Sequence, residues 1–227
     1  AAEKLQLLIT TPTFARNYTT VAKEHALDSL RLVILDGEKL TDAMELQLAE
    51  ALPKASILQG YGCTELGPVV AINVPDITHG GLLHRGYCKG SVGKPIPGVS
   101  IRIVDRTDDH ELAIDEEGLI LVKSASCMQG YYGDAPMTDA VMRDGWYVTG
   151  DIGKIDKHGF LHITDRMARF SKIGGEMVPH GKVEAALEAI IAKECHVTVV
   201  AVADVAKGEK LYVLTTETTL VPSEIHA

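Results

Sequence analysis

The sequence predicts an α/β region that continues into an antiparallel β region, followed by a small α+β unit. Three textures along the chain support this prediction. Strand and helix signals alternate up to about residue 60, short strands separated by turn residues follow from about residue 90, and a helix and two strands come after about residue 165. Alternating strands and helices indicate a parallel sheet, whereas closely spaced short strands indicate antiparallel pairing.

The first texture contains a β–α–β pattern. The apolar run RLVIL at 31–35 ends at Asp36-Gly37, as expected for a buried strand followed by a turn. Thr41 can cap a helix that has apolar residues at every fourth position and that Pro53 ends. SILQ at 56–59 is expected to form the next strand. This order predicts a parallel sheet whose ligand sites lie beyond the carboxyl ends of its strands.

The later textures are richer in turns. The segment GSVGKPIPG at 90–98 precedes short strands in the segments EEGLILVKS, GWYVTGDIGKID and HGFLHIT. Farther along, RFSKIGGEMVPH is expected to form a short strand and a turn. A helix at about 180–192 follows, and VTVVAVAD and KLYVLTTE supply two strands. We therefore expect two domains, residues 1–164 and residues 165–227.

Composition narrows the class of protein. At 227 residues and 46% hydrophobic, the chain can bury a core as a soluble globular protein does. Its formal charge of −9 argues against sequence-independent nucleic-acid binding, which depends on neutralising phosphates. No apolar run reaches the length of a membrane span, and the first residues lack the features of a signal peptide. The four cysteines form no C-x-x-C pair, so we expect reduced thiols of a cytoplasmic protein and no zinc site.

Four segments combine strands, turns and polar side chains: LDGEKL at 35–40, QGYGCTELG at 59–67, WYVTGDIG at 146–153 and TDRMARFSKIGGEMVP at 164–179. In the third, the Thr-Gly-Asp triplet is expected to end a strand. Taken singly, each segment fits a common loop ending, and a structural role is then the simpler interpretation. Their order and spacing together are specific.

Together the four segments resemble the acyl-adenylate-forming (AMP-binding) superfamily of acyl-CoA synthetases, firefly luciferases and peptide-synthetase adenylation domains. QGYGCTELG resembles the family's Y-G-x-T-E motif, VTGD its T-G-D motif and DRMARFSKIGG its hinge motif. GYGCTELGPVVAINVP and RFSKIGGEMVPH look most like bacterial long-chain acyl–acyl-carrier-protein synthetases, including the synthetase part of bifunctional 2-acylglycerophosphoethanolamine acyltransferases. The resemblance implies that residues 1–164 are the carboxyl-side part of the large adenylation domain and residues 165–227 the hinge and part of the small lid domain.

The resemblance implies an ATP-dependent acid–thiol ligase. Such an enzyme activates a fatty acid as acyl-AMP, with ATP and Mg²⁺, and transfers the acyl group to the phosphopantetheine thiol of acyl carrier protein or to coenzyme A. Because a carboxylate must approach an anionic triphosphate, Mg²⁺ and cations have to spread the developing charge. A non-catalytic nucleotide-binding module and an amino-acid adenylation domain are the alternatives. The expected location is the cytoplasm, with the inner face of the cell membrane as the alternative.

The resemblance assigns roles to the QGYGCTELG stretch. Glu65 matches the family glutamate that holds Mg²⁺, a hard cation that prefers oxygen ligands. Thr64 matches the residue that contacts the α-phosphate. Tyr61 is expected against the adenine face, and Gly60 and Gly62 let the backbone approach the ring.

The other three segments supply the remaining expected contacts. Gly37 and Glu38 match the turn that lines the other side of the adenine. Asp151 is expected to accept hydrogen bonds from both ribose hydroxyls, as an ionised carboxylate can. Arg166 is expected to reach the same ribose or phosphate region, and Lys172 to act in the second, thioester-forming orientation of the small domain.

The chain also departs from the family pattern. Ala168 occupies the hinge position where the family usually has Asp or Lys, so it offers no charge to hold either orientation. The phosphate loop of the form T-S-G-T-T-G-x-P-K-G and the late lysine of the G-K-x-x-R type do not occur in this sequence. We therefore expect an interior or carboxyl-side piece of a larger enzyme, with little or no ligase activity on its own. GSVGKPIPG is expected to be a structural turn near the acyl pocket, with Gly90 and Gly93 on the substrate side.

Overall fold

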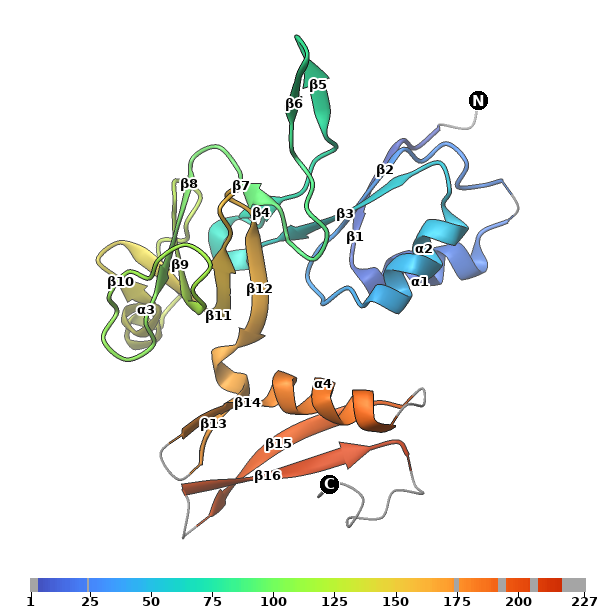
Figure 1. Ribbon diagram of the computed structural model, residues 1–227. Coiled ribbons are helices and arrows are strands. Elements are labelled where there is room, and N and C mark those ends of the chain that lie inside the picture. Colours follow the sequence, from blue (N-terminus) through green and yellow to red (C-terminus); the bar gives the residue numbers. More distant parts are fainter. Residues whose placement is uncertain (1–3, 24, 174–175, 192–194, 205–207, 218–227) are drawn as a thin grey trace. The chain divides into compact units, whose positions relative to one another are not determined.

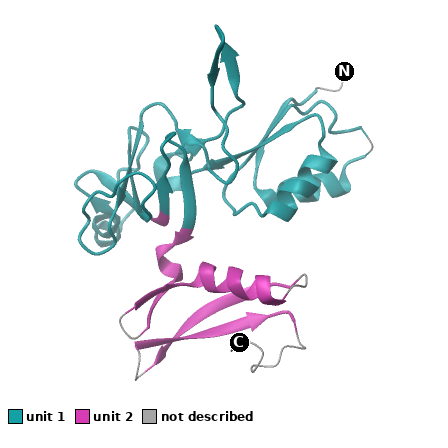
Figure 2. Ribbon diagram, viewed as in Figure 1, with its two compact units in different colours: residues 1–149, 153–164 teal, residues 150–152, 165–227 magenta. Residues whose placement is uncertain are grey.

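The computed structural model describes residues 4–23, 25–173, 176–191, 195–204 and 208–217. Contacts within the chain divide it into two compact units (Figure 2). Unit 1 contains residues 1–149 and 153–164, and unit 2 contains residues 150–152 and 165–227. Within the described residues, no helix combines the length and hydropathy needed to cross a membrane.

Unit 1 begins with three parallel strands and two helices (Figure 1). The strands are β1 (Leu7–Thr10), β2 (Leu32–Leu35) and β3 (Ser56–Tyr61), and the helices are α1 (Pro12–Val21) and α2 (Asp42–Ala51). Each helix starts at a threonine whose hydroxyl accepts a backbone N–H, from Phe14 to Thr11 and from Met44 to Thr41. The predicted parallel sheet and the Thr41 cap are confirmed, while β1 and α1 precede the first strand that the sequence predicted.

A compact apolar core joins these helices to the sheet. Val33 of β2 and Leu48 of α2 are fully buried, and Ala15 of α1 packs into the same cluster. Burying a valine or leucine side chain contributes roughly 1.5–3 kcal/mol. The packing fixes the carboxyl ends of β2 and β3, from which the predicted site residues follow.

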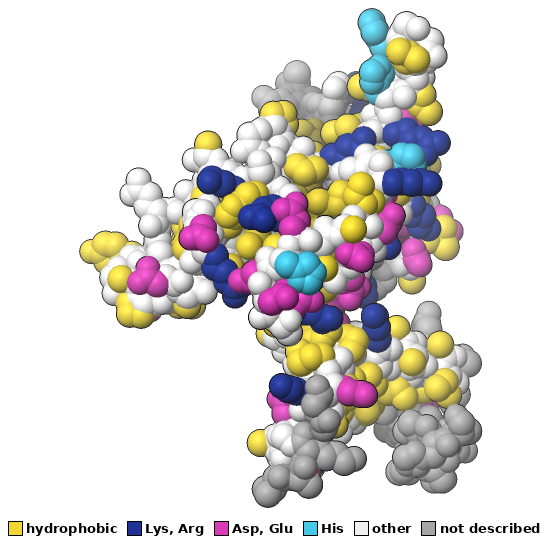
Figure 3. All heavy atoms as spheres, turned by 60° about the vertical axis from the view of Figure 1, so that its left-hand side comes forward, with side chains coloured by type: hydrophobic (Ala, Val, Ile, Leu, Met, Phe, Trp, Pro, Cys, Tyr) yellow, Lys and Arg dark blue, Asp and Glu magenta, His cyan; other side chains and the backbone are white. Residues whose placement is uncertain are grey.

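The first sheet changes direction after β3. Short β4 (Ala71–Ile72) pairs antiparallel with β3, and β7 (Lys94–Pro95) pairs with β4, giving the order β1-β2-β3-β4-β7. Between them, β5 (Ile77–His79) and β6 (Leu82–His84) form a hairpin of their own. Its side chains are exposed, with apolar and histidine side chains gathered at its end in Figure 3.

An antiparallel sheet completes unit 1. Its order is β10-β11-β9-β8, and β12 also pairs with β11. The elements of this region are η1 (Thr64–Leu66), β8 (Val99–Val104), β9 (Gly118–Ser124), α3 (Ala135–Val141), β10 (Met142–Arg143), β11 (Trp146–Ile155) and β12 (Leu161–Arg166). Buried Leu66, Ile120 and Leu161 belong to one core cluster, so η1 is anchored to this sheet.

The expectation that Thr-Gly-Asp ends a strand is wrong. The triplet lies inside β11, which continues to Ile155 and also pairs with β12. Within this strand Gly150 has a φ of +73°, in the left-handed region that favours glycine. Asp151 is therefore presented from the middle of a strand.

In its described residues, unit 2 contains a four-stranded antiparallel sheet and one α-helix. The order is β14-β13-β16-β15, and α4 packs against β15 (Figure 1). Its elements are η2 (Met167–Arg169), β13 (Phe170–Ile173), β14 (Glu176–Pro179), α4 (His180–Ile191), β15 (Val197–Asp204) and β16 (Gly208–Thr215). The helix and the two strands predicted for this region are confirmed.

Candidate functional site

The turns after β2 and β3 are held together by Asp36. Its carboxylate accepts the backbone N–H of Gly37 at 2.6 Å and also the backbone N–H of Gly62. Burial raises the pKa of Asp36, and the two hydrogen bonds counteract that shift. The turn carrying Gly37 and Glu38 thus lies beside the turn carrying Gly62. Sequence reasoning placed Asp36 only at the end of a strand and missed this role.

Glu38 is engaged at the start of α1. Its carboxylate accepts the Thr13 hydroxyl at 2.6 Å and the Thr13 backbone N–H at 3.2 Å. These bonds, the hydroxyl first, lower the pKa of Glu38. Glu38 therefore supports the first turn of a helix, where anionic groups are stabilised. Its contact with adenine stays a prediction.

Tyr61 and its neighbouring glycines lie at the end of β3. Tyr61 is buried in the core cluster that includes Leu66. A Cβ at Gly62 would lie 1.5 Å from the carbonyl oxygen of Pro68, whereas a Cβ at Gly60 would come no closer than 3.4 Å to any atom. Backbone packing alone thus requires glycine at position 62. The predicted stacking of Tyr61 on adenine stays a prediction.

Glu65 is held in place by two tyrosine hydroxyls. It follows Thr64 in η1, and its carboxylate accepts the Tyr131 hydroxyl at 2.9 Å. Its own backbone N–H, together with the hydroxyls of Tyr131 and Tyr147, lowers the pKa of Glu65, and burial opposes these bonds only partly. The side chain is therefore an oriented, ionised carboxylate, the form that a hard cation binds.

Tyr131 and Tyr147 were missed in the sequence. The bond to Glu65 raises the pKa of the Tyr131 hydroxyl, and burial, followed by the bond to Tyr131, raises that of Tyr147. Both hydroxyls thus remain protonated donors. Tyr131 comes from the loop before α3 and Tyr147 from β11, so only the folded chain brings them to Glu65.

In unit 2, Asp151 and Arg166 form an ion pair. Nε of Arg166 lies 3.0 Å from Oδ1 of Asp151. The Asp151 side chain is 8% exposed and that of Arg166 72% exposed, so a partly solvated guanidinium orients a buried carboxylate. The two residues predicted to reach the ribose are thus direct neighbours.

The hinge segment and Lys172 also belong to unit 2. Ala168 lies in η2, and the adjacent Arg169 forms an ion pair with Glu184 of α4. Lys172 is an exposed residue of β13 whose backbone N–H donates to Glu209 at 2.6 Å. These contacts hold the backbone of the hinge side of the unit and leave the role of the Lys172 ammonium group a prediction.

Known proteins match both the sequence and the fold. Residues 1–132, more than half of the chain, match the family model described as AMP-binding enzyme. The chain belongs to the AMP-binding enzyme family. Membership confirms the superfamily that the four motifs predicted.

Named relatives of this AMP-binding chain are CoA ligases. It is 32% identical over 199 residues to a long-chain-fatty-acid–CoA ligase of Yersinia pestis, covering 87% of this chain and 34% of that protein. It is 38% identical over 128 residues to the ligase of the same name from Salmonella typhimurium, covering 56% and 21%. With 4-coumarate–CoA ligase 1 of Glycine max it shares 32% identity over 165 residues, covering 72% and 55%. The chain thus spans about a third of the length of the Yersinia pestis ligase.

Solved structures agree with the fold of this AMP-binding chain. ATP-bound MatB from Rhodopseudomonas palustris matches with a TM-score of 0.78 at 26% identity, covering 98% of this chain and 43% of that chain. The o-succinylbenzoate CoA synthetase from Bacillus subtilis, in complex with ATP and magnesium, matches with a TM-score of 0.69 at 25% identity, covering 92% and 42%. The predicted fold class is confirmed.

Proposed function

We propose that this AMP-binding chain supplies the adenine, ribose and magnesium contacts of an ATP-dependent ligase. The ligase activates a fatty acid as acyl-AMP and transfers the acyl group to a thiol. The observation that carries the proposal is the oriented, ionised Glu65 at the carboxyl end of a parallel sheet, within a Y-G-x-T-E-like motif. Relatives named as fatty-acid–CoA ligases and similar structures with bound ATP support it.

The donor set around Glu65 fits Mg²⁺. Mg²⁺ takes oxygen ligands and commonly binds through one or two carboxylates plus phosphate oxygens and waters. Besides the Tyr131 hydroxyl, the Tyr147 hydroxyl, the Cys63 thiol and the Glu65 backbone N–H bond this carboxylate, so we propose that Mg²⁺ takes the place of one of these donors when it binds. When bound, the ion neutralises phosphate charge as pyrophosphate leaves. Thr64, next to Glu65, is proposed to place its hydroxyl against the α-phosphate.

The other predicted residues take binding roles. The turn at Gly37 and Glu38, tied to Gly62 through Asp36, is proposed to line the adenine with Tyr61. In unit 2, Asp151 is proposed to accept the ribose hydroxyls, and its bond to Arg166 supports that orientation. Lys172 and Arg166 are proposed to act from the small domain.

The acceptor is proposed to be a phosphopantetheine thiol, either of coenzyme A or of acyl carrier protein. The named relatives use coenzyme A by their names, whereas the RFSKIGGEMVPH stretch resembles acyl-carrier-protein synthetases. Incubating the full-length enzyme with labelled fatty acid, ATP and each acceptor in turn separates the two. The product that forms identifies the thiol.

Calorimetry with ATP and Mg²⁺ tests the proposed site on the full-length enzyme. We expect Glu65→Ala and Asp151→Ala each to weaken ATP binding about 10- to 100-fold, because each removes a charged hydrogen-bonding or metal-binding group. Glu50→Ala, at an exposed position of α2, is the matched control and is expected to bind ATP as the unaltered enzyme does. Unchanged affinity in both site variants would refute the proposed site.

Pyrophosphate exchange separates the alternative functions. Exchange that depends on a fatty acid supports the ligase, whereas exchange that depends on an amino acid indicates an adenylation domain of the peptide-synthetase type. Binding of ATP without exchange in the full-length protein indicates a non-catalytic module. We propose that the 227-residue chain alone gives little or no exchange, and a signal well above background from it would contradict that part.

A further inference from the structure

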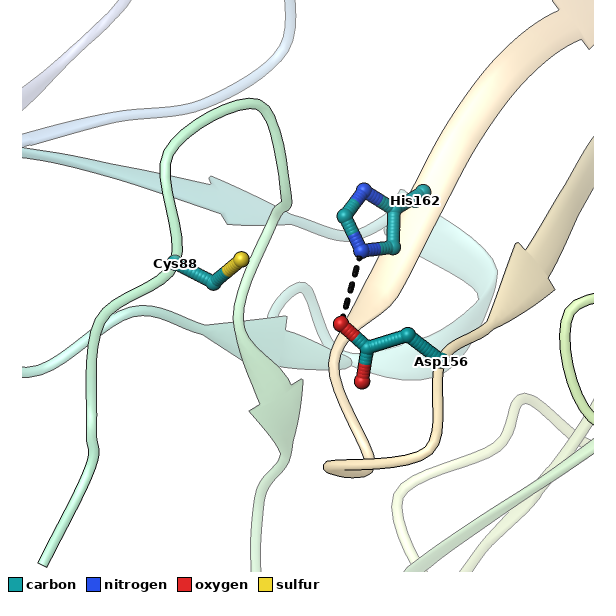
Figure 4. A group of neighbouring side chains, drawn as sticks. All are labelled: Cys88, Asp156 and His162. Carbon is teal, nitrogen blue, oxygen red and sulfur yellow. Dashed lines mark hydrogen bonds and ion pairs between the residues drawn. The ribbon is translucent and has the colours of Figure 1, made fainter.

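Cys88, Asp156 and His162 converge in unit 1 from different segments (Figure 4). Cys88 lies in the irregular loop 85–93, Asp156 begins the turn between β11 and β12, and His162 is in β12. The thiol sulfur, a carboxylate oxygen and a ring nitrogen all lie within 4.8 Å of one another. The proposed ligase chemistry uses none of these side chains.

The His162 ring is oriented as in a metal-bound histidine. Its Nδ1 lies 3.3 Å from the carbonyl oxygen of Gly90, and its Nε2 lies 3.1 Å from Oδ2 of Asp156. The Gly90 carbonyl and the Asp156 carboxylate can both only accept, so the donor depends on the tautomer, and in the tautomer with the proton on Nδ1 the ring donates to Gly90. Metal-binding histidines commonly donate their second ring N–H to a backbone carbonyl in this way. Nε2 is then the atom that faces both the carboxylate and, in Figure 4, the side of the thiol.

Asp156 is held by the backbone of its own turn. Its Oδ1 accepts the backbone N–H of His158 at 2.8 Å and that of Phe160 at 3.0 Å, which leaves Oδ2 directed at His162. In a tetrahedral zinc site with ligand bonds of about 2.0–2.2 Å, two such ligand atoms are about 3.3–3.6 Å apart. The observed 3.1 Å between Nε2 and Oδ2 is slightly shorter than that separation, so the two atoms would move slightly apart on binding.

Cys88 is placed by a buried polar network. Oδ1 of the fully buried Asn73 accepts the Cys88 backbone N–H at 3.0 Å, and its amide donates to the Ser91 carbonyl at 2.7 Å. The loop is also joined to β12, since Val92 donates to Leu161 at 2.9 Å. Hydrogen bonds at or next to all three residues therefore hold the backbone that carries the three side chains, as a preorganised site requires.

We propose that Cys88, Asp156 and His162 bind a thiophilic divalent cation of the zinc class, with one position left for water or another ligand. A thiolate with an imidazole favours zinc over Mg²⁺, which prefers oxygen ligands alone. Binding removes the thiol proton and leaves Nε2 as a lone-pair donor, so protons are released. This site is separate in its ligands from the Glu65 site, and it departs from the absence of a zinc site that the cysteine spacing predicts.

Cobalt substitution tests the site on the full-length protein after chelation. We expect one equivalent of Co²⁺ to give the intense visible bands of tetrahedral cobalt together with a thiolate-to-cobalt charge-transfer band, and Zn²⁺ to displace it. Cys88→Ser is expected to abolish the charge-transfer band and to weaken zinc binding about 10-fold or more, and His162→Gln to weaken zinc binding similarly. Cys195→Ser, in unit 2, is the control and should leave the charge-transfer band and the zinc affinity unchanged.

The proposal is overturned if Co²⁺ gives no charge-transfer band, or if the band persists in Cys88→Ser. Circular dichroism checks that the variants fold. If they do not, alkylation of the unaltered protein decides the question by mass spectrometry. Zinc, but not Mg²⁺, should then slow modification of Cys88 while leaving Cys195 unaffected, and equal Cys88 rates with and without zinc overturn the proposal.

Discussion

At the scale of single residues, the hydroxyls of Tyr131 and Tyr147 determine how Glu65 presents its carboxylate. Tyr131 donates to it at 2.9 Å, and both hydroxyls help to lower the pKa of Glu65. A metal ligand that is already oriented and ionised loses less entropy when the cation arrives. Tyr131 is therefore proposed to be a positioning residue for the metal step, and its exposed neighbour Tyr132 offers a matched comparison.

Replacing Tyr131 with phenylalanine should raise the Mg²⁺ requirement of the full-length enzyme. We expect about 10-fold more Mg²⁺ for half-maximal pyrophosphate exchange, the lower end of the effect of losing a group that orients a metal ligand. Removing the bond also lets the pKa of Glu65 rise, so the acidic limb of the pH–rate profile should move to higher pH. Tyr132→Phe should change neither quantity. A uniform loss of rate with unchanged Mg²⁺ and pH midpoints would show a merely structural role.

At the scale of elements, loop 85–93 is organised by side chains because it has no regular secondary structure. Asp76, before hairpin β5–β6, accepts the backbone N–H groups of Gly86 at 2.8 Å and Tyr87 at 3.0 Å. Asn73 then holds the backbone at Cys88 and Ser91. The loop that carries the Cys88 thiol is thus fixed at successive points along its length.

The Asp76 contacts should make stability depend on pH. The N–H groups of Gly86 and Tyr87 lower the pKa of Asp76 below its ordinary value of 3.8. A carboxyl group whose pKa is depressed by folding stabilises the protein above its unfolded pKa, and this contribution is lost as pH falls through the folded pKa. Asp76→Asn should therefore lower the urea midpoint at pH 7, and the difference from the unaltered protein should shrink below about pH 4.

Asp139→Asn, at an exposed position of α3, serves as the control for Asp76→Asn. It should leave the urea midpoint nearly unchanged at both pH values, since surface substitutions usually have small effects. An Asp76→Asn difference of the same size at pH 7 and at acidic pH would rule out the proposed linkage to the charge of Asp76.

At the scale of the whole molecule, local patterns were predictable and non-local contacts were not. Thr41 and the helix after it follow from short-range spacing, and Glu65 came from a motif that nine consecutive residues carry. Asp151 was expected at a strand end but lies inside β11. The length of β11 goes with its pairing to β12, a tertiary contact that the local sequence does not show. For the same reason, the bonds of Asp36 to Gly62 and of Tyr131 to Glu65 left no signal in the sequence, since each joins distant segments.

The residues proposed for the Mg²⁺ step and for thioester formation lie in different units, although Asp151 and Arg166 of unit 2 are also proposed to contact ATP. Unit 1 contains Thr64 and Glu65, proposed for adenylation, and unit 2 contains Lys172, proposed for thioester formation. Lys172→Ala in the full-length enzyme should therefore lower thioester formation about 10-fold, as expected for the loss of one charged hydrogen bond. Pyrophosphate exchange should stay close to that of the unaltered enzyme. Both rates are measured with the same fatty acid, with and without the thiol acceptor.

Two comparisons make this separation decisive. Glu65→Gln should lower pyrophosphate exchange itself, because the carboxylate charge that binds the cation is lost while the shape of the side chain is kept. Lys182→Ala removes another exposed lysine of unit 2 and should leave both half-reactions unchanged. If Lys172→Ala lowers exchange and thioester formation equally, Lys172 serves a step common to both, and its assignment to thioester formation is wrong.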